Sequence, residues 1–266
     1  MEDFFYRYNS PTVVQAHGED AEDYLQSQWT IDIRKIKTGQ IRFGLRLTSR
    51  GKILAGSYIA RMSDEEFLLI AQKTPRSELI KMMEENVVAD EVEFSDQSEN
   101  WELFSLHLAN STKLPFNQDL SSLGNREYLS YENGICWMDE CMPEGFYSGL
   151  FKKGSSIPNT FSEGLEPISE QRFDTLRIQS GNFSIPDEIG NEDLPQEAGA
   201  EKEMVDFNKG CYLGQEVMAR LHAMGKVRRY THPVAWDGHE SPCLPADLLL
   251  DSKTVGTLKT LQKDNH

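Results

Sequence analysis

The sequence predicts an α+β protein in which helices pack on a sheet of short antiparallel strands. Three runs rich in aliphatic residues, 41–47, 53–62 and 67–72, are joined by the short polar turns SRGK and SDEE, which is typical of an antiparallel meander. The chain has 266 residues, of which 38% are hydrophobic, so it can bury a sizeable core. This length is enough for two domains or two fused subdomains.

Helices are expected at four places. A strand at 11–15 is followed by GEDAEDYLQSQ (18–28), where apolar residues at helical spacing follow acidic residues that favour a helix N-terminus. Thr74 and Pro75 open the next helix, with the threonine as its cap and the proline in its first turn. Further helices are predicted from Ser169 to Gly181 and over QEVMARLHAM (215–224).

More strands are expected in the second half of the chain, at WELFSLHL (101–108), REYLSYE (126–132) and GICWM (134–138). After Gly225 the pattern becomes strand-like again, in VRRYTHPVAW, ADLLL and TVGTLKTL. We therefore expect a core over residues 1–225 and a short C-terminal β-domain over residues 226–266.

The charge balance is strongly acidic, with 43 acidic and 27 basic residues and a formal net charge of −16. Such a charge opposes direct nucleic-acid binding and docking on anionic membranes. Residues 84–102 carry eight carboxylates and no lysine or arginine, and are predicted to be a solvated surface. Residues 187–206 carry eight carboxylates and one lysine, and are predicted to be a surface loop. The balance reverses over residues 207–230, where five basic residues face one glutamate.

The N-terminus has no basic and apolar pattern, and no stretch approaches ~18 apolar residues, so neither a targeting peptide nor a membrane span is expected. The four cysteines, at 136, 141, 211 and 243, are too few for a disulfide framework and indicate reduced thiols in the cytoplasm. Cys136 and Cys141 lack two further ligands in the sequence, so we expect strand-borne core cysteines and no metal site.

The stretch KGCYLGQE (209–216) places a single thiol just before a predicted helix. The helix N-terminus and Lys209 both favour the thiolate of Cys211, and glycines at 210 and 214 permit a close backbone approach or a positive φ. Two interpretations remain open from these residues. Cys211 is either a reactive or ligand-contacting thiol, or a buried cysteine in a tight turn between strand and helix.

KGCYLGQEVMAR closely resembles the signature of the YgfZ-type folate-binding proteins, a branch of the superfamily that includes the aminomethyltransferase of the glycine cleavage system. GEDAEDYLQSQWTID, RGKILAGSYIAR, EEFLLIA, FDTLRIQSG and LPQEAG resemble further blocks of this superfamily, in its order, over residues 11–230. The resemblance implies two intertwined α+β subdomains around a central cavity for tetrahydrofolate, followed by a C-terminal β-barrel. Only about 40 residues follow Arg228, so that barrel would be small or reduced.

Two departures from the aminomethyltransferase pattern bear on catalysis. Ala55 and Gly56 stand where the transferases carry a paired aspartate that contacts the reacting folate nitrogen, and neither can perform proton chemistry. Gln179 stands where the transferases place a glutamate against the pterin ring; an amide can bond the ring edge but offers no carboxylate acceptor pair. Both departures argue against aminomethyl transfer.

The resemblance implies a cytoplasmic folate-binding protein that assists iron–sulfur cluster assembly or repair and, through iron–sulfur enzymes as clients, tRNA modification. Cys211 would be the functional thiol, with Lys209 favouring its thiolate. The expected folate-binding residues are Arg177, Gln179, Gln215, Glu216 and Arg228. Two other classes remain open: a tetrahydrofolate-dependent one-carbon enzyme of the aminomethyltransferase or demethylase kind, and a non-catalytic interaction module whose cavity no longer binds folate.

The basic cluster of Lys226, Arg228 and Arg229 also has two interpretations. It could bind the anionic glutamate tail of a folate, which needs a local positive site in an acidic protein. It could equally be a charged strand edge that discourages aggregation.

Overall fold

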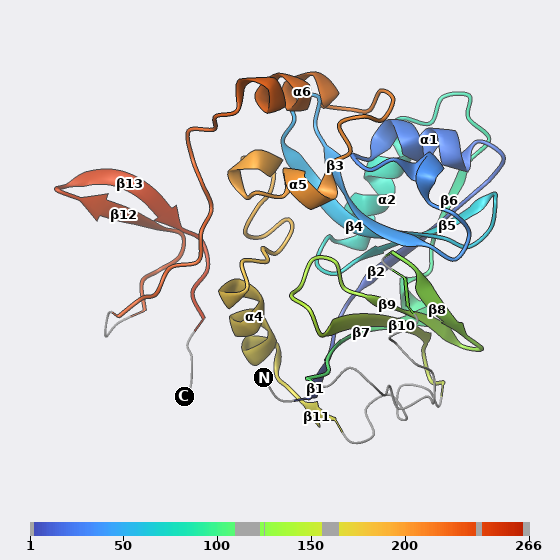
Figure 1. Ribbon diagram of the computed structural model, residues 1–266, viewed down its shortest axis with the longest axis horizontal. Helices are drawn as coiled ribbons and strands as arrows, with labels where there is room; N and C mark the ends of the chain where they lie inside the picture. The colour runs from blue at the N-terminus through green and yellow to red at the C-terminus, as the bar shows by residue number, and fades with distance from the viewer. Residues whose placement is uncertain (1–2, 110–122, 125, 156–164, 238–240, 263–266) are drawn as a thin grey trace.

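The structure is a computed structural model that describes residues 3–109, 123–124, 126–155, 165–237 and 241–262. The described residues form two large sheets that lie one above the other (Figure 1) and a third sheet of two strands near the C-terminus. The five-stranded sheet has, in spatial order, β3 (Ile41–Leu47), β4 (Ile53–Arg61), β5 (Glu66–Ala71), β2 (Thr12–His17) and β6 (Glu93–Asp96). The six-stranded sheet has β11 (Glu166–Pro167), β1 (Phe4–Arg7), β7 (Trp101–His107), β10 (Phe146–Lys152), β9 (Gly134–Met138) and β8 (Tyr128–Tyr131).

The predicted α+β class is confirmed, and so is the meander, because β3, β4 and β5 are neighbours with antiparallel pairing. The chain begins in the six-stranded sheet with β1, builds the five-stranded sheet from β2 to β6, and returns to the six-stranded sheet with β7. Strand β6 lies in the acidic stretch 84–102, whose residues are mainly exposed as expected.

Helices α1 (Ala21–Gln28) and α2 (Arg76–Glu84) cover one face of the five-stranded sheet (Figure 1). Their apolar side chains share a core with Val14, Ala55, Ile59, Phe67 and Leu69. The predicted cap of α2 is wrong: the cap position is Pro75, without a side-chain hydrogen bond, and the Thr74 hydroxyl has no partner among the described residues.

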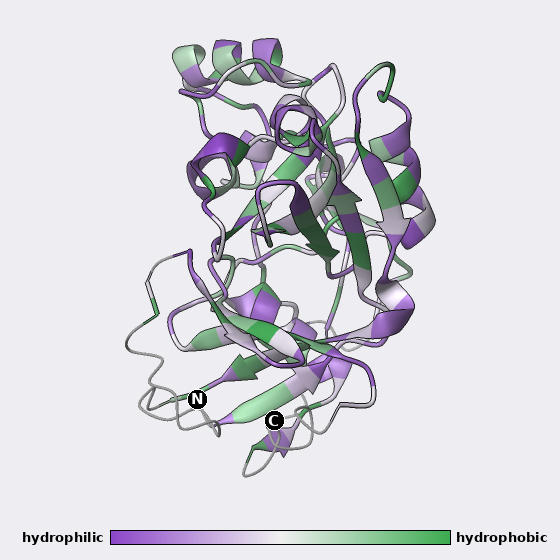
Figure 2. Ribbon diagram, turned by 90° about the vertical axis from the view of Figure 1, so that its right-hand side faces the viewer, coloured by the Kyte–Doolittle hydropathy of each residue, from purple (hydrophilic) through white to green (hydrophobic). Residues whose placement is uncertain are grey.

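The opposite face of the five-stranded sheet packs on the six-stranded sheet, and this is the largest core of the protein. Helix α4 (Glu170–Gln179) contributes Phe173 and Leu176 to it, and α6 (Gln215–Met224) contributes Met218. Both helices were predicted, and Ser169 caps α4 by accepting a hydrogen bond from the backbone N–H of Arg172. In Figure 2 the most hydrophobic stretches lie in the strands, as expected for sheets that bury a face on each other.

Residues 187–206 differ from the predicted solvated loop. They contain the 3-10 turn η4 (Pro195–Glu197) and the short helix α5 (Glu201–Met204). Glu188, Asp193 and Glu197 are buried because cations distant in sequence bind their carboxylates. The prediction erred because local composition does not reveal long-range ion pairs. Two further 3-10 turns are η1 (Ile33–Lys35) and η2 (Ser98–Asn100).

The C-terminal part is a β-hairpin rather than a closed barrel within the described residues. Strands β12 (Ala246–Leu250) and β13 (Lys253–Leu258) pair only with each other there, and the hairpin projects from the rest of the chain (Figure 1). The strand predicted over 227–236 is absent. The Lys259 ammonium donates hydrogen bonds to the Glu188 carbonyl (2.8 Å) and to Asp193 (2.6 Å), which ties the end of the hairpin to the core. The division at residue 225 stays a prediction.

Candidate functional site

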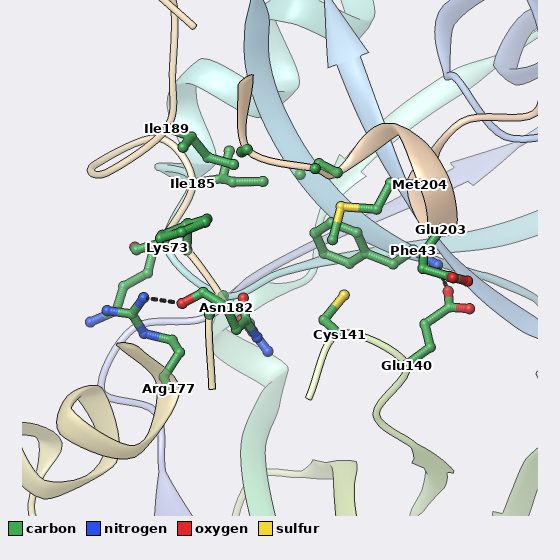
Figure 3. A pocket seen from close by; sticks show the side chains of 18 of the residues that line it. Phe43, Lys73, Glu140, Cys141, Arg177, Asn182, Ile185, Ile189, Glu203 and Met204 are labelled. Atoms are coloured by element: carbon green, nitrogen blue, oxygen red, sulfur yellow. Dashed lines mark hydrogen bonds between the residues drawn. The ribbon is translucent and has the colours of Figure 1, made fainter. Parts of the chain in front are cut away.

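A cavity of about 170 Å³ lies between the five-stranded sheet, helix α4 and the segment 181–204 (Figure 3). Its apolar walls come from Phe43, Phe173, Phe183, Ile185, Ile189 and Met204. Its polar lining includes Lys73, Glu140, Arg177, Asn182, Ser184 and Glu203. Apolar walls with a few polar groups are typical of small-molecule sites.

One of the two positions that correspond to the paired aspartate of the transferases, residue 56, lies in the wall of the cavity. Side chains alternate along β4, so Ala55 packs in the core beneath α1 and α2 while Gly56 lines the cavity. A Cβ atom on Gly56 would stand 2.6 Å from Cζ of Phe43 and 2.8 Å from Cδ1 of Ile185. The two side chains therefore occupy the space that a carboxylate at residue 56 would need.

One wall of the cavity is held by Arg177, which α4 presents towards segment 181–204. Its guanidinium binds Glu188 through two hydrogen bonds of 2.6 and 3.0 Å, Asp174 through two of 3.1 and 3.0 Å, and the Asn182 carbonyl at 2.8 Å. Burial alone would lower the pKa of Arg177, but the bonds and charges of Glu188 and Asp174 outweigh it and raise the pKa above its ordinary value. All five N–H donors of Arg177 are thus engaged.

The opposite end of the cavity carries carboxylates and a thiol from the loop after β9. Glu140 accepts a hydrogen bond from the backbone N–H of Phe43, and its second oxygen lies 3.7 Å from Nε of Arg126. Burial raises the pKa of Glu140 above its ordinary value, and burial also raises the pKa of the Cys141 thiol well above its usual range. Cys141 is therefore a protonated thiol at neutral pH. Figure 3 shows Glu140 and Glu203 on the side away from Lys73 and Arg177.

The signature loop, residues 209–216, lies between the end of α1 and the turn that joins β3 to β4. The backbone N–H of Leu213 donates to the Ser27 carbonyl at 3.1 Å. Gly214 has φ of 85°, and a Cβ atom there would stand 2.6 Å from the Thr48 carbonyl oxygen, so this position requires glycine. Cys211 is exposed, and it is not among the residues that line the cavity.

Lys209 anchors the signature loop from inside the protein. Its buried ammonium donates hydrogen bonds to the carbonyl oxygens of Gln26 (2.7 Å), Trp29 (2.5 Å) and Ile31 (2.7 Å), just where α1 ends. Burial lowers the pKa of Lys209 to about 7. The structure therefore gives the ammonium a structural contact with α1, whereas the sequence predicted an effect on Cys211.

Of the predicted site residues, the structure places only Arg177 in the cavity lining. Gln179 is exposed at the end of α4, Gln215 is the half-buried first residue of α6, and Glu216 and Arg228 are exposed. In the basic cluster, Arg229 binds Glu197 at 3.0 Å, which is neither of the two roles considered from the sequence.

Sequence reasoning missed Lys73, Glu140 and Cys141 as cavity residues because they come from separate stretches of the chain. The run DEC (139–141) at the end of a predicted strand was the available signal. No helix in the described part of the chain is long and apolar enough to cross a membrane. Among the same residues, no group of three or more His, Cys, Asp or Glu side chains is placed to hold a metal ion.

Comparisons with known proteins point to one superfamily. A sequence model of the GCVT N-terminal domain matches residues 9–114. An aminomethyltransferase from Rubrobacter xylanophilus is 25% identical over 269 residues, covering 91% of this chain and 71% of that protein. A tRNA-modifying protein YgfZ from Buchnera aphidicola is 25% identical over 220 residues, covering 81% of this chain and 68% of that protein.

The fold agrees with these matches. The crystal structure of the glycine cleavage system aminomethyltransferase T from Bartonella henselae superposes with a TM-score of 0.73 at 14% identity, covering 84% of this chain and 63% of that one. This chain thus spans about two thirds of the length of these proteins. The chain is thus similar in sequence to aminomethyltransferases and to YgfZ proteins, its residues 9–114 match the GCVT N-terminal domain, and its fold is similar to that of an aminomethyltransferase.

Proposed function

We propose that the cavity binds the ring end of a reduced folate such as tetrahydrofolate, and that the protein does not transfer aminomethyl groups. The observation that carries the proposal is the cavity itself, with aromatic and aliphatic walls and few polar groups, in a chain related to aminomethyltransferases and YgfZ proteins. Its volume of about 170 Å³ is below the ~300–1,000 Å³ of most small-molecule pockets, which suits a bicyclic ring better than a whole folate.

Gly56 has no side chain that could accept a proton. A carboxylate at this position would have to displace the ends of the Phe43 and Ile185 side chains, so the packing here suits glycine. Without a carboxylate at residue 56, the proposed site binds folate but lacks the proton acceptor that the resemblance to the transferases implies.

Anaerobic calorimetric titration with tetrahydrofolate tests this proposal. We expect saturable binding by the wild type and none by Ala198→Phe, which fills the cavity from its half-buried wall. Ala223→Phe, the same change on an exposed position of α6, is the matched control and should bind normally. We also expect no methylenetetrahydrofolate from an aminomethyl donor. Absent binding by the wild type would exclude the folate role, and turnover would favour a one-carbon enzyme.

We further propose that the protein supports iron–sulfur enzymes through Cys211, and tRNA modification through them. The support is the signature loop, the exposure of its thiol, and relatives named tRNA-modifying proteins. In cells lacking the protein, Cys211→Ser should fail to restore the activity of an iron–sulfur enzyme. Cys243→Ser, at another exposed thiol, should restore it. If both variants restored the activity equally, the Cys211 thiol would not be needed for this function.

A further inference from the structure

The cavity has an electrically asymmetric lining. Lys73 and Arg177 lie at one side, and Glu140 and Glu203 at the other (Figure 3). Asp174 also lines the cavity, and its carboxylate is paired with Arg177, so Lys73 is the cation that sets the charge of that side. A ligand with hydrogen-bond donors at one end and negative charge at the other would match this arrangement in only one orientation. The orientation of the ligand depends on which of these charged groups can still form hydrogen bonds.

Arg177 cannot serve as the ligand's cation, because all five of its N–H groups already bind Asp174, Glu188 and the Asn182 carbonyl. Among the described residues, Lys73 forms an ion pair with Glu170, and its side chain is 29% exposed. An ammonium has three donors, so Lys73 can bind a second anion.

Glu140 has the spare acceptors at the other end. A carboxylate offers about four lone-pair positions, and the backbone N–H of Phe43 uses one. Its second oxygen lies 3.7 Å from Nε of Arg126, and the charges of Arg42 and Asp139 also act on this carboxyl. Glu203 is more exposed and sits on the short helix α5, whereas Glu140 is fixed beside the aromatic wall by its bond to the Phe43 backbone.

The pyrimidine edge of a folate ring presents two adjacent donors, the ring N3–H and the 2-amino group, which a carboxylate can accept side by side. Gln179, which aligns with the ring-binding glutamate of the transferases, lies outside the cavity lining. We propose that Glu140 binds this edge instead, so that the ring lies against Phe43 and the anionic tail lies at Lys73. This inference rests on the proposed folate binding.

The test is a titration of wild type and Glu140→Gln with tetrahydrofolate and with its analogue that carries a methyl in place of the 2-amino group. Glutamine retains an oxygen for the Phe43 N–H but loses the acceptor pair, so the fold should persist. Glu144→Gln, exposed in the same loop and outside the lining, is the control. We expect Glu140→Gln to weaken tetrahydrofolate binding about 10- to 100-fold, and to leave the already weaker binding of the analogue unchanged.

A second pair of measurements examines the tail. Lys73→Met should weaken tetrahydrofolate binding but not the binding of tetrahydropterin, which has no tail. Measuring the affinity as a function of pH separates ligand binding by Glu140 from a merely structural role, because a structural role would not give the affinity this pH dependence. The wild-type affinity should fall as the pH falls through the raised pKa of Glu140, and the affinity of Glu140→Gln should stay level.

Equal effects of Glu140→Gln on both folates, or no effect, would overturn the assignment of Glu140 while leaving folate binding intact. Equal loss of tetrahydrofolate and tetrahydropterin in Lys73→Met would overturn the placement of the tail. Absence of binding to the wild type would instead overturn the proposed function and this inference with it.

Discussion

The cavity wall and the signature loop are each held in place by a buried cation, and the two cations differ in the groups that bind them. Arg177 binds two carboxylates and one carbonyl, whereas Lys209 hydrogen-bonds three carbonyl oxygens. The pKa of Arg177 is consequently raised above its ordinary value, and that of Lys209 is lowered by burial to about 7.

This difference means that the two regions respond differently to their surroundings. The raised pKa of Arg177 keeps its guanidinium charged, and able to pair with Glu188 and Asp174, at every pH near neutrality. The loop that carries Cys211 is tied to α1 by a buried ammonium whose pKa burial lowers to about 7. The neutral amine would donate two hydrogen bonds instead of three. The attachment of the thiol-bearing loop is therefore the more adjustable of the two.

Arg177→Met is expected to destabilise the protein most. It leaves buried Glu188 and partly buried Asp174 without their cation, and removing one partner of a buried pair typically costs ~3–5 kcal/mol. Urea unfolding at pH 7 would measure this loss. Arg220→Met, on an exposed position of α6, should change stability by less than ~0.5 kcal/mol. A loss below ~1 kcal/mol for Arg177→Met would mean that the wall does not depend on these pairs.

The next expected effect is the contribution of Lys209 to the pH dependence of the free energy of unfolding. Its pKa is about 7 in the folded protein and near 10.5 in the unfolded chain, so the folded state binds fewer protons between these values. Wild-type stability should therefore rise with pH from about 7 to about 10.5, relative to Lys209→Met. Urea unfolding of both proteins across this range would measure the difference. If the difference in stability between the two proteins does not change with pH, the three carbonyl oxygens keep the lysine charged.

The smallest effect separates two neighbouring arginines that the sequence could not distinguish. Arg229→Ala removes the partner of buried Glu197, but the guanidinium is 60% exposed, so we expect a loss of ~1 kcal/mol or less. Arg228→Ala should change stability by under ~0.5 kcal/mol, because Arg228 is exposed. Thermal unfolding of the two variants compares them. Equal losses would argue against a contribution of the Arg229 ion pair.

The sequence predicted the parts of the fold that depend on local pattern. The meander and helices α1 and α6 follow from periodicity, because side chains on one face of a helix or strand recur at fixed spacing. Helix α4 follows from its start and stop signals, Ser169 and Gly181. The strand expected over 227–236 did not form, although its composition suits one. A strand needs a neighbour to complete its hydrogen bonds, and local pattern does not provide that information.

The cavity was beyond prediction from the sequence for a related reason. Lys73, Glu140 and Arg177 approach one space only after two sheets and a helix have packed, and no spacing along the chain relates them. The family signature directed attention to Cys211, whereas the structure places the enclosed space elsewhere.

The contact of Phe43 and Ile185 over Gly56 also has a consequence for the space in the cavity. A single substitution that introduced aspartate at residue 56 would place its Cβ atom 2.6 and 2.8 Å from these two side chains. Phe43 and Ile185 border the cavity, so they would have to move into it to accommodate the carboxylate. Restoring the transferase carboxylate would thus reduce the space left for a ligand.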